Sequence, residues 1–266
     1  MARGYVRNPD ATRGVSANGQ TTLVSSGQVA CGTTVEIVNP NTCTPCADRQ
    51  IGEIWISSPS VTRGYWGRPA ETTQTFEARV ANHDARTFLR SGDLGVCIEG
   101  ELYVVGRLKD VIIVRGLNYY PQDLETTVEQ RIHPLVRAGC TAAFAVTGHC
   151  DERVVVAVEI DPREVGRASN DRARIHSATA LSPDVRAILD GIGEQILAVI
   201  AEQHGIRLHA VAILPPGGIP KTSSGKLCRY AAAQAFRRNE LNEIVRRNGQ
   251  GQQPTPAARS RLMADA

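Results

Sequence analysis

The residue in this sequence best placed to do chemistry is Lys226, which ends the heptapeptide PKTSSGK at residues 220–226. Pro220 fixes its own φ angle, Gly225 permits a left-handed backbone, and the hydroxyls between them can satisfy the backbone of a tight turn. We therefore expect a loop that presents the ammonium group of Lys226 to a substrate. A nucleotide-binding P-loop is excluded, because that motif needs a glycine where Pro220 stands and a hydroxyl residue where Leu227 stands. The alternative is an ordinary solvated turn before a helix that begins near Leu227.

Asp93 and Arg107 are further candidates for binding a polar ligand. Asp93 lies in the segment FLRSGDLG (residues 88–95), and we expect it in a turn between two β segments, where its carboxylate can bind a sugar diol. The alternative is an Asx turn, in which the side chain bonds to its own backbone. Arg107 follows in GRLKD, and its planar guanidinium can bind hydroxyl or phosphate oxygens. The alternative for Arg107 is a surface ion pair with Asp110 or another neighbour.

Two other patterns are assigned structural rather than chemical roles. Cys43 and Cys46 have the CxxC spacing of a redox or zinc motif, but no second pair accompanies them and a polar loop follows. We therefore expect no metal site, and the 7 cysteines, an odd number, indicate reduced thiols. Asp123 and Glu125 fall in the first turn of a helix predicted to begin at Pro121, and we expect them to be capping residues rather than catalysts.

The composition is that of a globular protein of 266 residues, with 42% hydrophobic and 21% charged residues. A formal net charge of +3 is too slight to indicate a nucleic-acid partner. No apolar stretch approaches the roughly 20 residues that span a bilayer, and no secretory leader is apparent, so we expect no transmembrane segment and a cytoplasmic location.

The elements that must position these residues change in character along the chain. Short β-type runs separated by turn residues occupy residues 23–25, 34–38, 53–57, 96–98 and 102–105. Strands and helices then alternate, with strands at 111–114, 141–146, 154–160 and 210–214, helices at 121–131, 184–204 and from about 227, and a polar loop at 161–183. The patterns predict an α+β protein, in which a small antiparallel β-rich subdomain precedes a compact α+β domain. We expect a loop at 1–21, the β-rich part at 22–106, the α+β domain at 107–240 and a disordered tail at 241–266.

Four segments in order resemble the adenylate-forming superfamily of acyl-CoA synthetases, peptide-synthetase adenylation domains and luciferases. They are GEIWI with RGYW (residues 52–66), RSGDL (90–94), GRLKD (106–110) and PKTSSGK (220–226). Within the superfamily, the sequence NYYPQDLE at 118–125, the start GEIW and the final PKTSSGK most resemble the C-terminal half of a fatty acyl-AMP ligase. The resemblance implies that the β-rich subdomain is a distorted barrel, and residues 1–22 resemble the end of an insertion typical of these ligases.

The resemblance also implies roles for single residues. By matching position, Asp93 would hold the ribose hydroxyls of ATP, Arg107 would assist on the same sugar, and Lys109 would sit at a hinge. Lys226 would act where a fatty acid carboxylate attacks the α-phosphate of ATP. The implied cofactors are ATP and Mg²⁺, and the implied partners are a fatty acid and an acyl carrier protein or polyketide synthase. Ser91 stands where the family motif carries threonine, and the hydroxyl is retained.

Two motifs of the family do not occur in these 266 residues: the Ser/Thr/Gly-rich phosphate loop and the aromatic-Gly-x-x-Glu segment that supplies a magnesium-binding glutamate. We therefore expect a fragment that is inactive alone and active only with a separately encoded N-terminal half. One alternative is a fragment of a fatty acyl-CoA ligase. Another is a non-catalytic carrier-docking module or gene remnant.

Overall fold

The computed structural model describes residues 3–6, 21–81, 86–147, 152–169 and 181–249. The chain divides into two compact units, Met1–Asp123 and Leu124–Ala266. The first is mainly antiparallel sheet and the second combines sheet with helices, so the predicted α+β class is confirmed. The expected domain boundary near residue 106 stays a prediction. Among the described residues, no helix is both long and apolar enough to cross a membrane.

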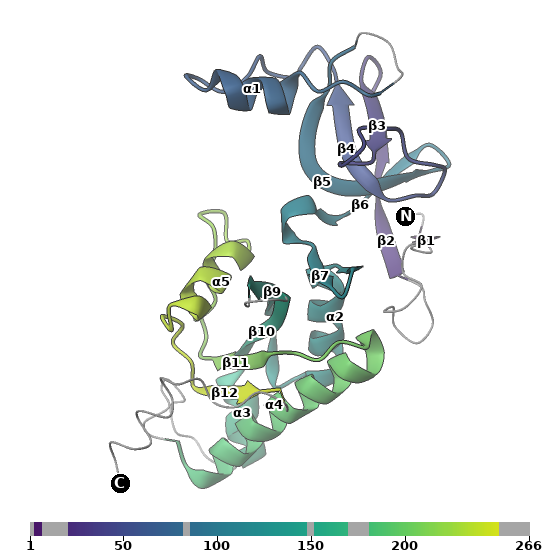
Figure 1. Ribbon diagram of the computed structural model, residues 1–266. Coiled ribbons are helices and arrows are strands. Elements are labelled where there is room, and N and C mark those ends of the chain that lie inside the picture. The colour runs from purple at the N-terminus through teal and green to yellow at the C-terminus, as the bar shows by residue number, and fades with distance from the viewer. Residues whose placement is uncertain (1–2, 7–20, 82–85, 148–151, 170–180, 250–266) are drawn as a thin grey trace. The chain divides into compact units, whose positions relative to one another are not determined.

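The first unit is built on a six-stranded antiparallel sheet with the order β1-β2-β6-β5-β4-β3 (Figure 1). Its strands are Arg3–Val6 (β1), Thr21–Gln28 (β2), Thr34–Val38 (β3), Gly52–Ser57 (β4), Leu89–Ile98 (β5) and Glu101–Arg107 (β6). The β-type runs predicted in the sequence fall within strands β2 to β6 of this sheet. A small core of Val38, Trp55, Val80 and Phe88 packs on the sheet.

The predicted turn around Asp93 is wrong, because Asp93 lies inside the long, curved strand β5 (Figure 1). On β4 Glu53 pairs with Leu94 and Trp55 pairs with Arg90, so the residues between Arg90 and Leu94 outnumber those opposite them. Gly92 adopts a φ angle of 73° at this place. A β-bulge therefore replaces the turn, and it bends the strand at the residue that was expected to bind a ligand.

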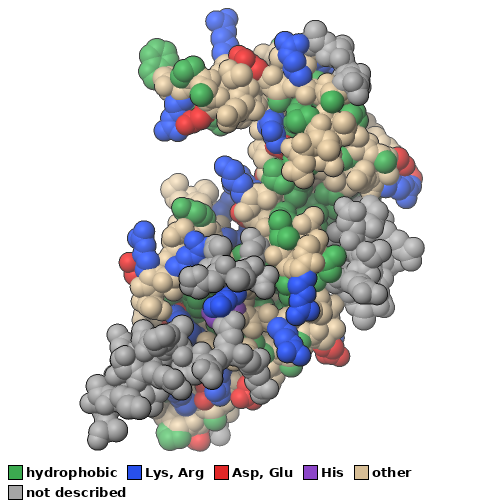
Figure 2. All heavy atoms as spheres, in the orientation of Figure 1, with side chains coloured by type: hydrophobic (Ala, Val, Ile, Leu, Met, Phe, Trp, Pro, Cys, Tyr) green, Lys and Arg blue, Asp and Glu red, His purple; other side chains and the backbone are tan. Residues whose placement is uncertain are grey.

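Smaller elements complete the first unit. They are helix α1 (Pro69–Phe76), the 3₁₀ turn η1 (Leu108–Asp110) and the hairpin β7 (Ile112–Val114) with β8 (Leu117–Tyr119). Helix α1 has no buried residue, and no apolar periodicity in the sequence predicted it. Beside it, Tyr65 packs edge-on against Phe76 and Trp66 is fully exposed. Hydrophobic and charged side chains accordingly lie together over α1 in Figure 2.

The second unit contains a four-stranded sheet with the order β12-β11-β10-β9. Strands β10 and β11 are parallel, and the outer pairs are antiparallel. The elements are α2 (Pro121–Ile132), β9 (Val136–Thr147), β10 (Glu152–Ile160), α3 (Pro162–Ser169), α4 (Pro183–His204), β11 (Ala210–Leu214), α5 (Arg229–Arg237) and β12 (Val245–Asn248). Helices cover both faces of this sheet, so the side chains on both faces of its central strands are buried. This explains why these strands are continuous apolar runs in the sequence.

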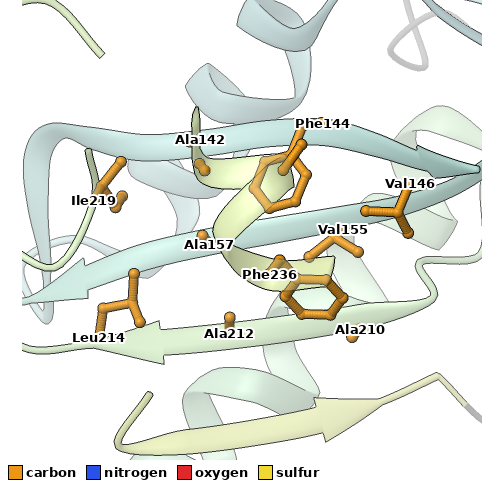
Figure 3. Packing of buried hydrophobic residues seen from close by; sticks show 12 residues of the cluster. Ala142, Phe144, Val146, Val155, Ala157, Ala210, Ala212, Leu214, Ile219 and Phe236 are labelled. Atoms are coloured by element: carbon orange, nitrogen blue, oxygen red, sulfur yellow. The ribbon is translucent and has the colours of Figure 1, made fainter. Parts of the chain in front are cut away.

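One face of this sheet forms a hydrophobic core with α5 (Figure 3). Phe144 on β9 and Phe236 on α5 meet edge to face, with ring centroids 6.1 Å apart. Helix α4 lies on the opposite face, where Gly193 comes next to Ile213. Burial of Val185, Leu189, Ile192, Ile196 and Val199 confirms the helical spacing predicted for α4.

Two expected loops contain regular structure. Within 161–183, residues Pro162–Ser169 form α3, because Pro162 suits the first helical position and the carboxylate of Asp161 accepts from the amide of Arg163 at 2.9 Å. Residues 170–180 lie outside the described residues. Within 1–21, Arg3–Val6 form β1, which pairs with β2. Residues 1–2 and 7–20, and with them most of the expected insertion remnant, lie outside the described residues.

The tail expected to be disordered from residue 241 begins instead with an ordered segment. Ile244 and Val245 are buried, and Val245–Asn248 form β12 along the edge of β11. The polar composition of this stretch concealed the strand, because its three apolar residues, Leu241, Ile244 and Val245, stand among charged and amide side chains. Residues 250–266 lie outside the described residues.

Candidate functional site

Asp93 and Arg107 form an exposed ion pair across adjacent strands. They are directly opposite in the register of β5 and β6, and Arg107 Nε donates to Asp93 Oδ1 at 3.2 Å. The side chain of Arg107 is 72% exposed and that of Asp93 is 37% exposed. An ion pair this exposed contributes only about 0–1 kcal/mol to stability. A contribution to stability therefore does not account for this pair. Both side chains are exposed enough to form hydrogen bonds with hydroxyl or phosphate groups of a ligand.

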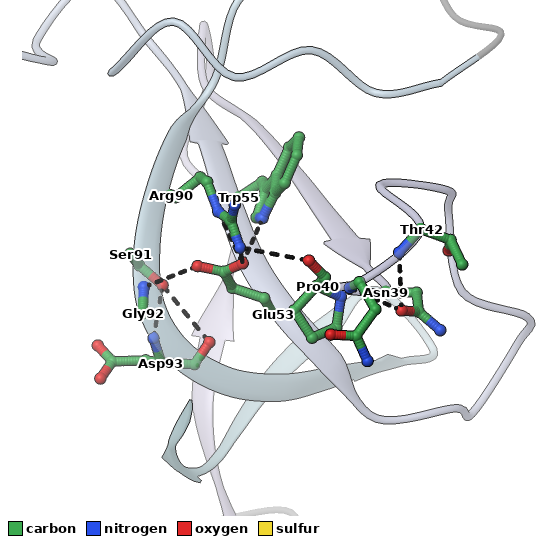
Figure 4. A network of polar contacts seen from close by, with 10 residues as sticks. Asn39, Pro40, Thr42, Glu53, Trp55, Arg90, Ser91, Gly92 and Asp93 are labelled. Carbon is green, nitrogen blue, oxygen red and sulfur yellow. Dashed lines mark hydrogen bonds and ion pairs between the residues drawn. The ribbon is translucent and has the colours of Figure 1, made fainter. Parts of the chain in front are cut away.

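The bulge that carries Asp93 is held by the buried carboxylate of Glu53 (Figure 4). Glu53 is only 2% exposed, and its Oε2 accepts from Arg90 Nη2 at 2.7 Å and Nε at 3.0 Å. The same oxygen accepts from Trp55 Nε1 at 2.9 Å. Oε1 accepts from the amide of Gly92 at 3.2 Å. A buried carboxylate must be compensated in this way, and here the compensation fixes the backbone next to Asp93.

Ser91 supports the same bulge from its other side. Its Oγ accepts from the amide of Asp93 at 3.0 Å. A threonine hydroxyl at this position would make the same contact, so the difference from the family motif leaves this hydrogen bond intact. Glu53 and Arg90 were not among the site residues predicted from the sequence. The sequence does contain one sign of Glu53's role, because a glutamate within the apolar run GEIWI is expected to be buried and paired with a positive charge.

Lys226 belongs to a tight hairpin in the second unit. Gly225 has a φ angle of 80° and its amide donates to the Thr222 carbonyl at 2.9 Å, while the amide of Thr222 donates to the Lys226 carbonyl at 2.8 Å. Thr222 Oγ1 also accepts from the amide of Lys226 at 3.1 Å. The left-handed glycine and the hydroxyl-satisfied backbone were predicted from the sequence and are confirmed. Residues 221–226 are all exposed.

The candidate residues thus fall into two groups. Asp93, Arg107 and Lys109 belong to the first unit, where the structure brings the first two into contact. Lys109 is exposed in the 3₁₀ turn η1, directly after β6. Lys226 belongs to the second unit. The ligand and hinge roles of these residues stay predictions.

Among the described residues, there is no group of three or more His, Cys, Asp or Glu side chains that could hold a metal ion. No chemical step is therefore assigned to Mg²⁺ on these residues. The described cysteines, Cys43 and Cys46 among them, are thiols rather than disulfides.

The chain is similar to known fatty acid ligases in sequence. Residues 10–66 match the AMP-binding enzyme family. The chain is 39% identical over 221 residues to the medium-chain fatty acid–acyl-carrier-protein ligase JamA of Moorena producens, covering 83% of this chain and 34% of JamA. It is 35% identical to the long-chain fatty acid–AMP ligase FadD26 of Mycobacterium marinum, covering 79% and 33%. It is also 35% identical to the putative fatty acid–CoA ligase FadD21 of Mycobacterium bovis, covering 84% and 36%.

The fold is similar to solved structures of the same kind. One comes from studies of the fatty acyl-adenylate ligases of E. coli and L. pneumophila, with a TM-score of 0.63, 31% identity and coverage of 85% of this chain and 34% of that one. Another is McyG A-PCP complexed with phenylalanyl-adenylate, with a TM-score of 0.62, 26% identity and coverage of 82% and 30%. The chain spans about a third of the length of the curated relatives it matches. With the α+β fold and the ordered motifs, these matches show that the chain belongs to the adenylate-forming superfamily and is similar to its fatty acyl-AMP ligases.

Proposed function

We propose that this chain is the C-terminal part of a fatty acyl-AMP ligase, in which Asp93 and Arg107 bind the ribose of ATP. The observation that carries the proposal is the exposed Asp93–Arg107 pair on a bulge fixed by the buried Glu53. A carboxylate and a guanidinium side by side can accept from and donate to the two hydroxyls of a ribose. The similarity to FadD26, named as a long-chain fatty acid–AMP ligase, supports ATP and a fatty acid as the substrates.

Lys226 is the proposed catalytic residue of the reaction. An oxygen of the fatty acid carboxylate attacks the α-phosphorus of ATP, and a new oxygen–phosphorus bond forms. The bond from the α-phosphorus to the bridging oxygen breaks, and pyrophosphate leaves with the bonding electrons. Two anions must approach one another in this step, so an exposed ammonium group lowers the barrier. The contribution of one such donor is about 3 kcal/mol.

We further propose that the 266-residue polypeptide alone does not form acyl-adenylate. Its matches cover about a third of its relatives, and reactions of this type depend on positioning by all parts of the site. The part of the relatives that these residues do not match would complete the enzyme. The acyl group would then pass to a carrier protein, as the name of JamA as an acyl-carrier-protein ligase supports.

The test is a chimaera in which this chain replaces the matching region of JamA. Exchange of pyrophosphate into ATP is measured with a series of fatty acids. We expect exchange by the chimaera, none by the chain alone, and a loss of about a hundredfold in the Lys226→Ala chimaera. Exchange by the chain alone at comparable rates would refute the need for a further part. An active chimaera that is insensitive to Lys226→Ala would refute the role of the lysine.

A fatty acyl-CoA ligase is the second candidate, favoured by the similarity to FadD21, which is named as a fatty acid–CoA ligase. The molecule that accepts the acyl group distinguishes the acyl-AMP ligase from the acyl-CoA ligase. The active chimaera is offered either CoA or a holo acyl carrier protein after acyl-adenylate has formed. Acyl transfer to the carrier protein alone supports the AMP ligase, whereas a CoA thioester supports the second candidate. A non-catalytic docking module would leave the chimaera without exchange under any condition.

A further inference from the structure

The lysine hairpin, residues 220–228, is attached to the rest of the second unit near its base, where Lys221 Nζ also lies 3.6 Å from Cys140 Sγ on β9. Every residue from 221 to 226 is exposed, and the hydrogen bonds described above run within the hairpin itself. At the base, the amide of Cys228 donates to the Pro220 carbonyl at 2.9 Å, which closes the two arms. What holds these arms against the rest of the second unit therefore determines where Lys226 lies.

The first arm is held by the fully buried Glu159 on β10. Its Oε1 accepts from the amide of Ile219 at 3.1 Å, directly before the hairpin. Its Oε2 accepts from Arg137 on β9 at 2.6 Å. Ile219 is itself buried, in the core that α5 forms with the sheet. The start of the hairpin is thus tied to the centre of the unit.

The second arm is held by Glu125, which was expected to cap α2. Instead it makes a bidentate ion pair with Arg229, the first residue of α5: Nε donates to Oε1 and Nη2 donates to Oε2, both at 2.7 Å. Oε1 also accepts from the amide of Ala143 on β9 at 2.9 Å. One carboxylate, 8% exposed, thereby connects α2, β9 and the start of α5.

Resting on the function proposed above, we propose that Glu125 and Arg229 are positioning residues for Lys226. Arg229 follows Lys226 by three residues, and its planar guanidinium holds the carboxylate through two hydrogen bonds at once. The buried pair costs desolvation that a hydrophobic contact would avoid, so a role beyond stability accounts better for its presence. The pair sets the distance and direction from which the exposed lysine reaches its substrate, without touching that substrate.

The first experiment measures hydrogen exchange of the hairpin amides in the full chain. In the Glu125→Gln variant we expect the amides of Thr222 and Cys228 to exchange at least about tenfold faster. The matched control is Glu243→Gln, because Glu243 makes a bidentate pair of the same geometry with Arg246, at 2.6 and 2.7 Å, beyond the other end of α5. Equal exchange of residues 220–228 in the two variants would overturn the proposal. Arg229→Lys keeps the positive charge but loses the bidentate contact, so we expect an intermediate increase in the exchange rates of these amides. This variant tests the proposal even if Glu125→Gln does not fold.

The second experiment separates positioning from general stability in the chimaera. We expect Glu125→Gln to lower kcat about tenfold and to leave the KM for ATP unchanged, since ATP is assigned to the first unit. Arg229→Lys should restore part of kcat. Equal effects of Glu125→Gln and Glu243→Gln on kcat would overturn the proposal. If the unaltered chimaera shows no exchange of pyrophosphate while the hairpin amides still depend on Glu125, the proposed function fails and the positioning of the hairpin stands.

Discussion

Arg107 lies directly opposite Asp93 on the neighbouring strand, with 3.2 Å between its Nε and the carboxylate Oδ1. The bulge in β5 makes this possible, because it turns Asp93 to the exposed side on which Arg107 ends β6. The two residues can therefore bind one ligand group together. Its exposure and its support by Glu53 are the reasons for which we propose that this pair binds a ligand.

For this pair, we predict that Asp93→Ala in the chimaera raises the KM for ATP at least about tenfold, because a hydrogen bond to a charged group contributes about 1.5–3 kcal/mol. The stability of the chain should change by less than about 1 kcal/mol. The control is Glu71→Ala, which removes a comparably exposed ion pair with Arg68 at 3.0 Å. A KM for ATP that rises equally in both variants would contradict the assignment.

The buried Glu53 predicts a large effect of its partner on stability. Arg90→Met leaves the carboxylate buried without its main counter-charge, and we expect a loss of about 3 kcal/mol in the unfolding free energy. Arg68→Met, which disrupts an exposed pair, should cost less than about 1 kcal/mol. Urea unfolding is followed by tryptophan fluorescence, because both tryptophans, Trp55 and Trp66, lie in the first unit. Similar losses in the two variants would show that Glu53 is not the centre of the network.

His204 predicts a pH dependence of the second unit. Burial lowers the pKa of His204 below its ordinary value of 6.5, and its Nε2 lies 2.8 Å from Thr127 Oγ1. The unfolded chain therefore takes up the proton first, so stability is complete above 6.5 and falls as the pH drops below it. The loss is at most about 1.4 kcal/mol per pH unit for one group.

The measurement for His204 is hydrogen exchange of α4 at about pH 7.5 and about pH 5.5, corrected for the intrinsic rates. In the His204→Gln variant the difference between the two pH values should shrink. His133→Gln serves as the control, because His133 is exposed at the end of α2. An unchanged pH dependence after His204→Gln would exclude this histidine as its source.

Cys140 is predicted to be an unreactive thiol. Burial raises its pKa, and the charge of Glu159 raises it further, against an opposing effect of Lys221. Since the thiolate is the reactive form, iodoacetamide should alkylate exposed Cys31 more than about tenfold faster than Cys140. In concentrated urea the two rates should converge. Mass spectrometry of proteolytic digests measures alkylation at both cysteines. Equal alkylation rates in the folded chain would contradict the burial of Cys140.

Part of the local structure of this protein was determined by sequence alone. Strand β3, strand β11, helix α4 and the left-handed Gly225 were predicted because their signals are short-range: the pattern of apolar side chains and a glycine in a turn. The order of the four motifs likewise identified the superfamily that the comparisons confirm. Neither result depends on which distant residues meet.

The positions of the candidate site residues were decided by tertiary structure. The bulge at Asp93 arises from pairing with β4, which no local pattern in residues 88–95 reveals. Glu125 was assigned to a helix cap by its place in the first turn, yet its partner Arg229 is 104 residues away. A buried carboxylate must find a counter-charge wherever the fold supplies one, and sequence spacing does not encode that choice. Sequence therefore determined which groups are present, and packing determined how they are held.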